Sequence, residues 1–258
     1  QCFNEARGDY IQILGDDDIY VRGTLTRVVE LLELNDYGVL CLRPFGYDKD
    51  PNSEYPGRVG GIREYLDVGN FLSAIGPLIT FISSLIIKRS LHPDLDARQF
   101  CGCNLVQVHL AMQVAIAAPK NAFLTEYVLA CKRNNSGGYD APEIFVERLG
   151  HILDSYRGNK FTDADIRKFE TRMLLSHHPF YLLRQRMDDE DDRYDTHRRF
   201  KMRFAKRALF HIWVAPIMLL PRPIALVWGS FTTVMGRILN GDLRRGITFA
   251  LHRLKRRP

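Results

Sequence analysis

Three consecutive aspartates directly follow a short apolar run, and this combination limits the folds that the chain can adopt. The run at residues 10–14 predicts a β-strand that ends on Gly15, and Asp16, Asp17 and Asp18 come next. Unpaired carboxylates are too costly to bury together in a core, so this strand must end at an edge of a sheet. We expect that edge to be the C-terminal edge of a parallel strand, which faces the ligand crevice in open α/β sheets.

Carboxylate oxygens held at such an edge are hard ligands for a metal ion. They suit Mg²⁺ or Mn²⁺, whose coordination is typically completed by the phosphate groups of a substrate. The three aspartates therefore predict a metal–diphosphate site. The residues alone leave one alternative open, in which they form an acidic turn that caps the helix after it.

Apolar periodicity over the first half of the chain alternates between strand and helix patterns. The predicted strands are residues 10–14, 37–42, 80–87 and 123–131. The predicted helices are residues 24–34, with Thr24 as the candidate N-cap, 62–72 and 105–118. This alternation predicts an α/β body. From Pro142 the pattern becomes helical, and we expect helices over residues 143–156, 162–176 and 180–187.

The net charge of +6 is distributed unevenly along the 258 residues. Residues 198–258 contain 14 Lys and Arg and a single acid, and so carry +13, which leaves −7 on residues 1–197. A uniformly basic nucleic-acid-binding protein is therefore not expected, and we predict no nucleic-acid partner. The pattern predicts three regions: an α/β domain over 1–140, a helical extension with an acidic linker over 141–197, and a basic tail over 198–258.

The basic tail combines apolar segments with cations. Residues 210–220 and 224–235 are apolar, but each is too short to span a bilayer, and a Pro-Arg-Pro sequence separates them. Residues 242–254 place apolar side chains on one face and arginines on the remainder, which is typical of a helix lying on anionic lipid. We therefore predict that residues 198–258 dock on an anionic membrane surface. The alternative is that these helices pack back on the protein with their bases solvated.

The segment around the aspartates resembles the metal-binding segment of family 2 glycosyltransferases of the GT-A fold. In that family a helix ending in Ala-x-Gly-(Asp/Glu)-Tyr leads into a strand, the strand ends in an Asp-x-Asp type motif, and a second helix follows. The matching residues here are Ala6, Gly8, Asp9, Tyr10, Asp16, Asp17, Asp18, Gly23, Thr24 and Leu25. The commonest family form has aspartate at the position of Gly15, which leaves open which pair forms Asp-x-Asp. The Gly-Asp-Asp-Asp form resembles an abequosyltransferase-like bacterial branch.

The same resemblance implies further site residues. Residues 127–138 resemble the family's strand that runs into a flexible basic loop, which implies that Lys132 and Arg133 close over the donor diphosphate. A solvated loop is the alternative for these two cations. The acid that usually serves the family as base is absent from residues 100–105, and we name Asp96 as the candidate base, with a plain turn role as its alternative.

For the fold, the resemblance implies an α/β protein with a GT-A, Rossmann-like sheet. It also implies an N-terminal truncation, because the first strands of that sheet would precede this chain. A helical membrane-associating region is expected to follow the sheet. For the site, it implies that Asp16, Asp17, Lys132 and Arg133 bind a nucleotide-sugar donor, and that Asp16, Asp17 and Asp18 bind Mg²⁺ or Mn²⁺.

For function, the resemblance implies a metal-dependent inverting glycosyltransferase that moves a hexosyl or deoxyhexosyl group to a lipid-linked or polysaccharide acceptor. The expected setting is bacterial surface-polysaccharide synthesis, such as that of O-antigen, on a polyprenyl-diphosphate-linked glycan. The expected location is the cytoplasmic face of the inner membrane, in a peripheral or monotopic mode. The alternative is a non-catalytic GT-A-like protein that binds a sugar nucleotide or acts as a scaffold at the membrane.

Overall fold

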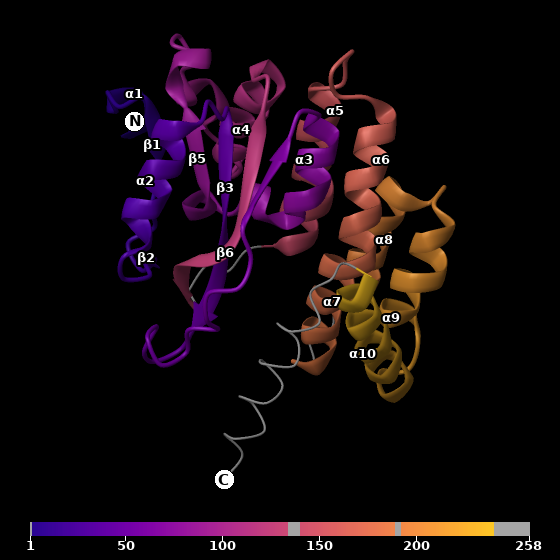
Figure 1. The fold of residues 1–258 in the computed structure, drawn as a ribbon. Helices are drawn as coiled ribbons and strands as arrows, with labels where there is room; N and C mark the ends of the chain where they lie inside the picture. Colours follow the sequence, from indigo (N-terminus) through magenta and orange to yellow (C-terminus); the bar gives the residue numbers. More distant parts are fainter. Residues whose placement is uncertain (1, 134–139, 189–191, 240–258) are drawn as a thin grey trace. The chain divides into compact units, whose positions relative to one another are not determined.

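The computed structural model describes residues 2–133, 140–188 and 192–239 of the chain (Figure 1). Its contacts divide the chain into two compact units. Unit 1 comprises Gln1–Tyr139 and His151–Ile166, and unit 2 comprises Asp140–Gly150 and Arg167–Pro258. Unit 2 thus begins at residue 140, and both of the regions predicted after that point contribute to it.

Unit 1 is built on a six-stranded mixed sheet. Its strands are β1 (Tyr10–Gln12), β2 (Ile19–Tyr20), β3 (Val39–Tyr47), β4 (Ile62–Tyr65), β5 (Leu85–Lys88) and β6 (Asn121–Lys132). The order is β1-β5-β3-β6. On the side of β6 away from β3, β4 pairs with the first residues of β6, and β2 pairs with Leu129 and Ala130 of β6. β3 and β6 are parallel, and the other pairs are antiparallel.

Strand β1 lacks the parallel neighbour that the sequence predicts. It pairs antiparallel with β5, and β5 pairs antiparallel with β3. Two reversals return β1 to the direction of β3 and β6, so these three strands end at the same edge of the sheet. We call this the carboxyl edge. The prediction of a parallel neighbour is wrong, but the aspartates that follow β1 lie at the edge where the parallel pair β3–β6 also ends.

Helices accompany the sheet of unit 1 (Figure 1). They are α1 (Cys2–Glu5), α2 (Thr24–Leu34), α3 (Val68–Ile75) and α4 (Val106–Ala117). Val28 of α2 lies in a buried cluster with Leu40 of β3 and Val128 of β6, while α4 contacts β3 and β5. The first four residues of β3 are all fully buried, which is expected for a strand whose sheet is covered on both faces.

Helix α2 begins at Thr24, as predicted, but Thr24 is not its N-cap. That position is held by Gly23, whose φ of 77° lies in the left-handed region. The Thr24 hydroxyl donates to the carbonyl oxygens of Val21 (2.7 Å) and Val128 (3.1 Å) instead of accepting a helix N–H. The start of α2 is therefore fixed by glycine and by a link to β6.

Residues 80–87 do not form the single strand that was predicted. Two 3₁₀ turns, η1 (Gly76–Thr80) and η2 (Ile82–Ser84), come before β5 and leave it four residues long. The buried Ser84 hydroxyl donates to the carbonyl oxygen of Phe81 (2.8 Å), and such local hydrogen bonds compete with a sheet ladder.

Residues 62–72 likewise do not form one helix. The first four of them form β4, which pairs with the beginning of β6. Helix α3 begins after Asp67, whose carboxylate accepts a hydrogen bond from the Asn70 N–H (2.6 Å). The apolar spacing here comes from two elements that happen to follow each other with a helical period.

The chain after residue 140 is helical, as predicted. Its elements are η5 (Glu143–Arg148), α5 (Leu149–Ser155), α6 (Asp163–Arg172), η6 (Met173–His177), α7 (His178–Met187), α8 (Arg193–Phe204), η7 (Phe210–Val214), α9 (Ala215–Leu219) and α10 (Arg222–Leu239). Three of these, η5, η6 and η7, are π-helical turns continuous with their neighbours. The helices predicted over 143–156, 162–176 and 180–187 are confirmed.

The apolar segment 210–220 packs inside unit 2. Phe210, Val214 and Ile217 are fully buried in one cluster with Phe200 and Leu182. These side chains belong to a protein core. The buried part of this segment therefore packs back on the protein, as the alternative prediction has it, and is not in contact with lipid.

Some predictions fall outside the described residues. Of the acidic linker at 188–192, only Asp188 and Asp192 are described, and the loop 134–138 and the predicted helix 242–254 lie outside. Within the described ranges, no helix is both long enough and apolar enough to cross a membrane.

Candidate functional site

The candidate site lies at the carboxyl edge of unit 1. The three aspartates connect β1 to β2, and β2 places Ile19 opposite Ala130 of β6. Tyr47, at the end of β3, is opposite Lys132, at the end of β6. Segments that are far apart in the sequence therefore meet at one edge because of strand direction and register.

The carboxylates of Asp17 and Asp18 converge over Gly15. A Cβ atom built on Gly15 would lie 3.0 Å from Asp18 Oδ2 and 3.5 Å from Asp17 Oδ1, so glycine leaves open the space between two carboxylate oxygens. Asp18 is buried, Asp17 is half-buried and Asp16 is exposed. Within the described part of the chain, none of these three carboxylates makes an ion pair or a hydrogen bond.

This donor set is suited to a hard divalent cation. A buried carboxylate without a counter-charge is costly, and a cation between Asp17 and Asp18 would remove that cost. The described residues contain no group of three or more His, Cys, Asp and Glu side chains that could hold a metal. Two carboxylates match the way Mg²⁺ is commonly bound, with water and substrate phosphates supplying the other ligands. Asp17 and Asp18 therefore fit such an ion, and a ligand role for the exposed Asp16 stays a prediction.

Neighbouring polar side chains fix the acidic turn. The Gly15 N–H donates to the hydroxyl of the fully buried Ser83 (2.9 Å). The Gln12 amide donates to the Ser83 carbonyl oxygen (2.6 Å), and the Tyr20 hydroxyl donates to Gln12 Oε1 (2.5 Å). Strands β1 and β2 are thereby tied to η2 on either side of the aspartates, which holds the carboxylates in one arrangement.

Tyr47 connects the aspartates to the end of β6. Its hydroxyl donates to the backbone carbonyl oxygen of Asp17 (3.3 Å), and the Lys132 ammonium lies 5.0 Å from the centre of its ring. The same ammonium donates to the backbone carbonyl oxygen of Asp48 (2.5 Å). The structure therefore brings the predicted cation Lys132 and the backbone of the predicted site residue Asp17 to the same tyrosine.

Arg133 makes ion pairs with the loop that follows β3. Its guanidinium pairs with Asp48 (3.2 Å) and Glu54 (3.1 Å) and lies against Gly46. Burial acts to raise the pKa of Glu54, but hydrogen bonds from the Lys49 and Asp48 N–H groups and the Arg133 charge hold it below its ordinary value. Arg133 is thus engaged in fixing the loop after β3, and the closure of Lys132 and Arg133 over a donor diphosphate stays a prediction.

Asp96 lies away from the carboxyl edge. The aspartates follow the end of β1, whereas residues 89–98 follow the end of β5, which is antiparallel to β1. Asp96 also accepts a hydrogen bond from Asn4 (2.5 Å) in α1, which precedes β1. Both observations place it near the opposite edge of the sheet from Asp17 and Asp18.

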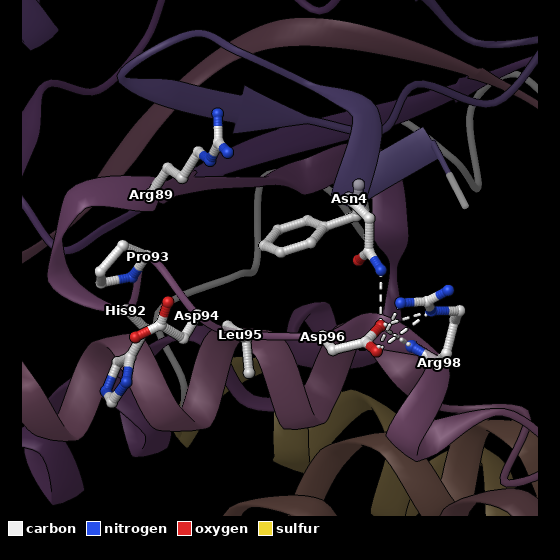
Figure 2. A pocket seen from close by; sticks show the side chains of 9 residues that line it. Asn4, Arg89, His92, Pro93, Asp94, Leu95, Asp96 and Arg98 are labelled. Atoms are coloured by element: carbon white, nitrogen blue, oxygen red, sulfur yellow. Dashed lines mark hydrogen bonds and ion pairs between the residues drawn. The ribbon is translucent and has the colours of Figure 1, made fainter.

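Figure 2 shows the surroundings of Asp96, which lines a cavity of about 190 Å³. The Arg98 guanidinium (3.0 Å), the Asn4 amide and the Arg98 N–H (2.9 Å) hold the pKa of Asp96 well below its usual range. A carboxylate with so low a pKa is a weak base. These contacts fit the alternative, a turn role, and the assignment of Asp96 as the base stays a prediction that its position and low pKa do not favour.

The sequence analysis missed Tyr47, Ser83 and Gln12. Adjacent serines at 83 and 84 inside an apolar run were a sign of local structure there, because a buried hydroxyl needs a partner. Tyr47 and Gln12 carried no such sign, since their roles depend on strand register.

We compared the chain with protein families, curated proteins and solved structures. Residues 1–91 match the family model described as Glycosyl transferase family 2. No curated protein matches the chain at a significant level. Among solved structures, S. aureus TarS 1–349 in complex with UDP-GlcNAc is similar, with a TM-score of 0.51 and 14% identity, covering 94% of this chain and 69% of that one. TarS 1–349 with UDP aligns at a TM-score of 0.48 and 16% identity, over 94% and 68% of the two chains.

At this level of identity the TarS likeness concerns the fold. It agrees with the mixed sheet and with the helices around it. Residues 1–91 therefore match glycosyl transferase family 2, and the chain has a mixed α/β fold of the GT-A-like glycosyltransferase type.

Proposed function

We propose that this chain is a glycosyltransferase that uses a UDP-sugar as donor, with Asp17 and Asp18 at the centre of its donor site. The observation that carries the proposal is the convergence of their two carboxylates over Gly15. This arrangement lies within the segment that matches the glycosyltransferase family, and the similar TarS structures are complexes with UDP-GlcNAc and UDP.

The chain's own residues take distinct roles in this proposal. Asp17 and Asp18 would hold Mg²⁺ or Mn²⁺, which supplies neutralising charge for a departing diphosphate. Lys132 contacts the diphosphate from the end of β6, and Arg133 keeps the loop after β3 in place through Asp48 and Glu54. Ser83 and Gln12 hold in place the turn to which the carboxylates belong.

The finer assignment is an inverting transfer in bacterial surface-polysaccharide synthesis, of the abequosyltransferase-like kind. The acceptor hydroxyl attacks the anomeric carbon of a hexosyl or deoxyhexosyl donor as the diphosphate leaves. The acceptor is a polyprenyl-diphosphate-linked glycan, and the enzyme works at the cytoplasmic face of the inner membrane. The Gly-Asp-Asp-Asp form of the motif and the cationic C-terminal region support this setting.

A second candidate function is a GT-A-like protein that binds a sugar nucleotide without transferring the sugar. One observation favours it: no further carboxylate or imidazole joins Asp17 and Asp18 within the described residues, and Asp96 belongs to another part of unit 1. Under this reading, the donor binds and is not consumed.

The deciding experiment measures UDP release from UDP-GlcNAc and other UDP-sugars, with cell-envelope lipid extract as the acceptor source. We expect Mg²⁺-dependent turnover that falls roughly 100-fold or more in Asp18→Asn, because the charge that holds the cation is lost. Asp96→Asn is the matched control and should keep wild-type turnover. Full activity of Asp18→Asn would exclude the proposed site, while donor binding without turnover in the wild type would establish the second candidate.

A further inference from the structure

Helix α10 has an unusual distribution of side-chain size. Its buried face carries only small residues, at a spacing of four, three and four: Ala225, Gly229, Thr232 and Gly236. A Cβ atom on Gly236 would lie 2.0 Å from the Leu175 carbonyl oxygen, so this face approaches the backbone of η6 closely. Of the large apolar residues of α10, Trp228 packs half-buried against the core of unit 2.

A second set of large apolar residues lies on the outward face of α10 and is exposed. Ile224, Val227, Phe231, Val234 and Ile238 follow a spacing of three, four, three and four, and Val227 is 72% exposed. A surface helix of a water-soluble protein normally turns its polar face to water. Small residues between helices and large apolar residues outside are instead the pattern of helices in contact with lipid.

The charges of α10 agree with an anionic partner. The helix contains no Asp or Glu, and its two cations, Arg222 and Arg237, stand in its first and last turns. It belongs to the segment 198–258, with its net charge of +13. A second copy of the chain would bring two such segments together, and their like charges would repel.

We propose that the outward face of α10 is a membrane-docking surface, which lies flat on an anionic bilayer and inserts Val227, Phe231 and Val234 at the level of the acyl chains. The length of α10 and the absence of a spanning helix among the described residues fit a helix that lies in the interface. The proposal does not depend on glycosyl transfer, since bilayer binding is measured without donor or acceptor.

The two tryptophans of the chain serve as reporters for this surface. The rings of Trp213 and Trp228 lie 6.0 Å and 5.5 Å from the ring of Phe231. Insertion of Phe231 brings both indoles to the headgroup level, where bromine on lipid acyl chains quenches their fluorescence. No added label is needed.

The experiment combines flotation of the full chain with vesicles and quenching by brominated lipid. Vesicles contain phosphatidylcholine alone or with phosphatidylglycerol. We expect binding to the anionic vesicles with Trp quenching, and a drop of about tenfold or more in the bound-to-free ratio for the double variant V227E/V234E, because hydrocarbon excludes the new charges. V227L/V234L keeps the apolar face and should retain binding.

The matched control is L34E/L66E, which makes the same charge change at two exposed leucines of unit 1 and should bind like the wild type. Binding that V227E/V234E leaves intact would place lipid contact elsewhere in the basic segment and overturn the proposal. Absence of vesicle binding would also overturn it, as would a dimer in solution that only V227E/V234E dissociates, since that face would then hold a second copy.

Discussion

Single residues decide whether the acidic turn can hold a cation. Gly15 has no side chain, so Asp17 and Asp18 can turn their oxygens toward the same space, while Ser83 accepts its N–H. The aspartates were predictable because three charges in a row after an apolar run cannot be buried together. The different exposure of Asp16 and Asp18 was not predictable, because it depends on how β2 pairs with β6.

We predict that Gly15→Ala lowers turnover and Mg²⁺ affinity by about tenfold, because a methyl group 3.0 Å from Asp18 Oδ2 displaces the carboxylate. Gly15 is not among the positive-φ glycines, so backbone strain does not confuse the result. The readout is UDP release as a function of Mg²⁺ concentration.

The control is Gly23→Ala, whose φ of 77° strains alanine but whose Cβ would meet nothing. It should lose about 1 kcal/mol of folding stability with an unchanged Mg²⁺ dependence. If Gly15→Ala had the Mg²⁺ dependence of the wild type, the space over Gly15 would not be the cation site.

At the scale of elements, strand direction explains what the sequence could and could not predict. The element at 24–34 was predicted from its helical period, and those at 105–118 and 123–131 were predicted from continuous apolar runs. Residues 62–72 and 80–87 were misassigned because hydrogen bonds of Asp67 and Ser84 interrupt the apolar pattern there. The place of Asp96 could not be predicted, because it depends on β5 running antiparallel to β1.

The link between η2 and β1 gives a second prediction. Ser83→Ala removes the acceptor of the Gly15 N–H and should lower the free energy of unfolding by about 1–3 kcal/mol. It should also lower turnover, because the acidic turn loses its anchor. Urea denaturation and UDP release are the two measurements.

Ser84→Ala is the matched control, since Ser84 is equally buried but its hydroxyl bonds to Leu78, Phe81 and Cys41 and not to the acidic turn. It should reduce stability and leave turnover nearly unchanged. Equal effects of the two variants on turnover would mean that Ser83 acts only through general stability.

At the scale of the whole molecule, unit 2 contains a buried pair of titratable groups. His178 is buried against Phe200 and His177 is half-buried against Phe145, and both Nε2 atoms are buried without a hydrogen-bond partner among the described residues. Burial lowers the pKa of His177 to about 4. Burial, followed by the neighbouring His177, lowers the pKa of His178 well below its ordinary value. Both imidazoles are therefore neutral in the folded unit at neutral pH.

Unit 2 should consequently lose stability in acid. The unfolded chain takes up protons below pH 6.5, the ordinary histidine pKa, while the folded His177 resists protonation until about pH 4. The contribution of neutral His177 to the free energy of unfolding is complete above pH 6.5. It is lost as the pH falls toward 4, and the loss is on the order of 3 kcal/mol. Urea unfolding followed by fluorescence of Trp213 and Trp228, both in unit 2, measures it. His177→Phe should flatten this pH dependence, and an unchanged slope would assign it to other groups.

The central claim is that Asp17 and Asp18 together hold a divalent cation for the donor diphosphate. Electron paramagnetic resonance of Mn²⁺, titrated into the full chain with UDP present, measures this directly through the signal of the free ion. We predict that the wild type and Asp96→Asn deplete free Mn²⁺ equally, and that the double variant D17N/D18N leaves it in solution. Equal depletion by the double variant and the wild type would contradict the claim.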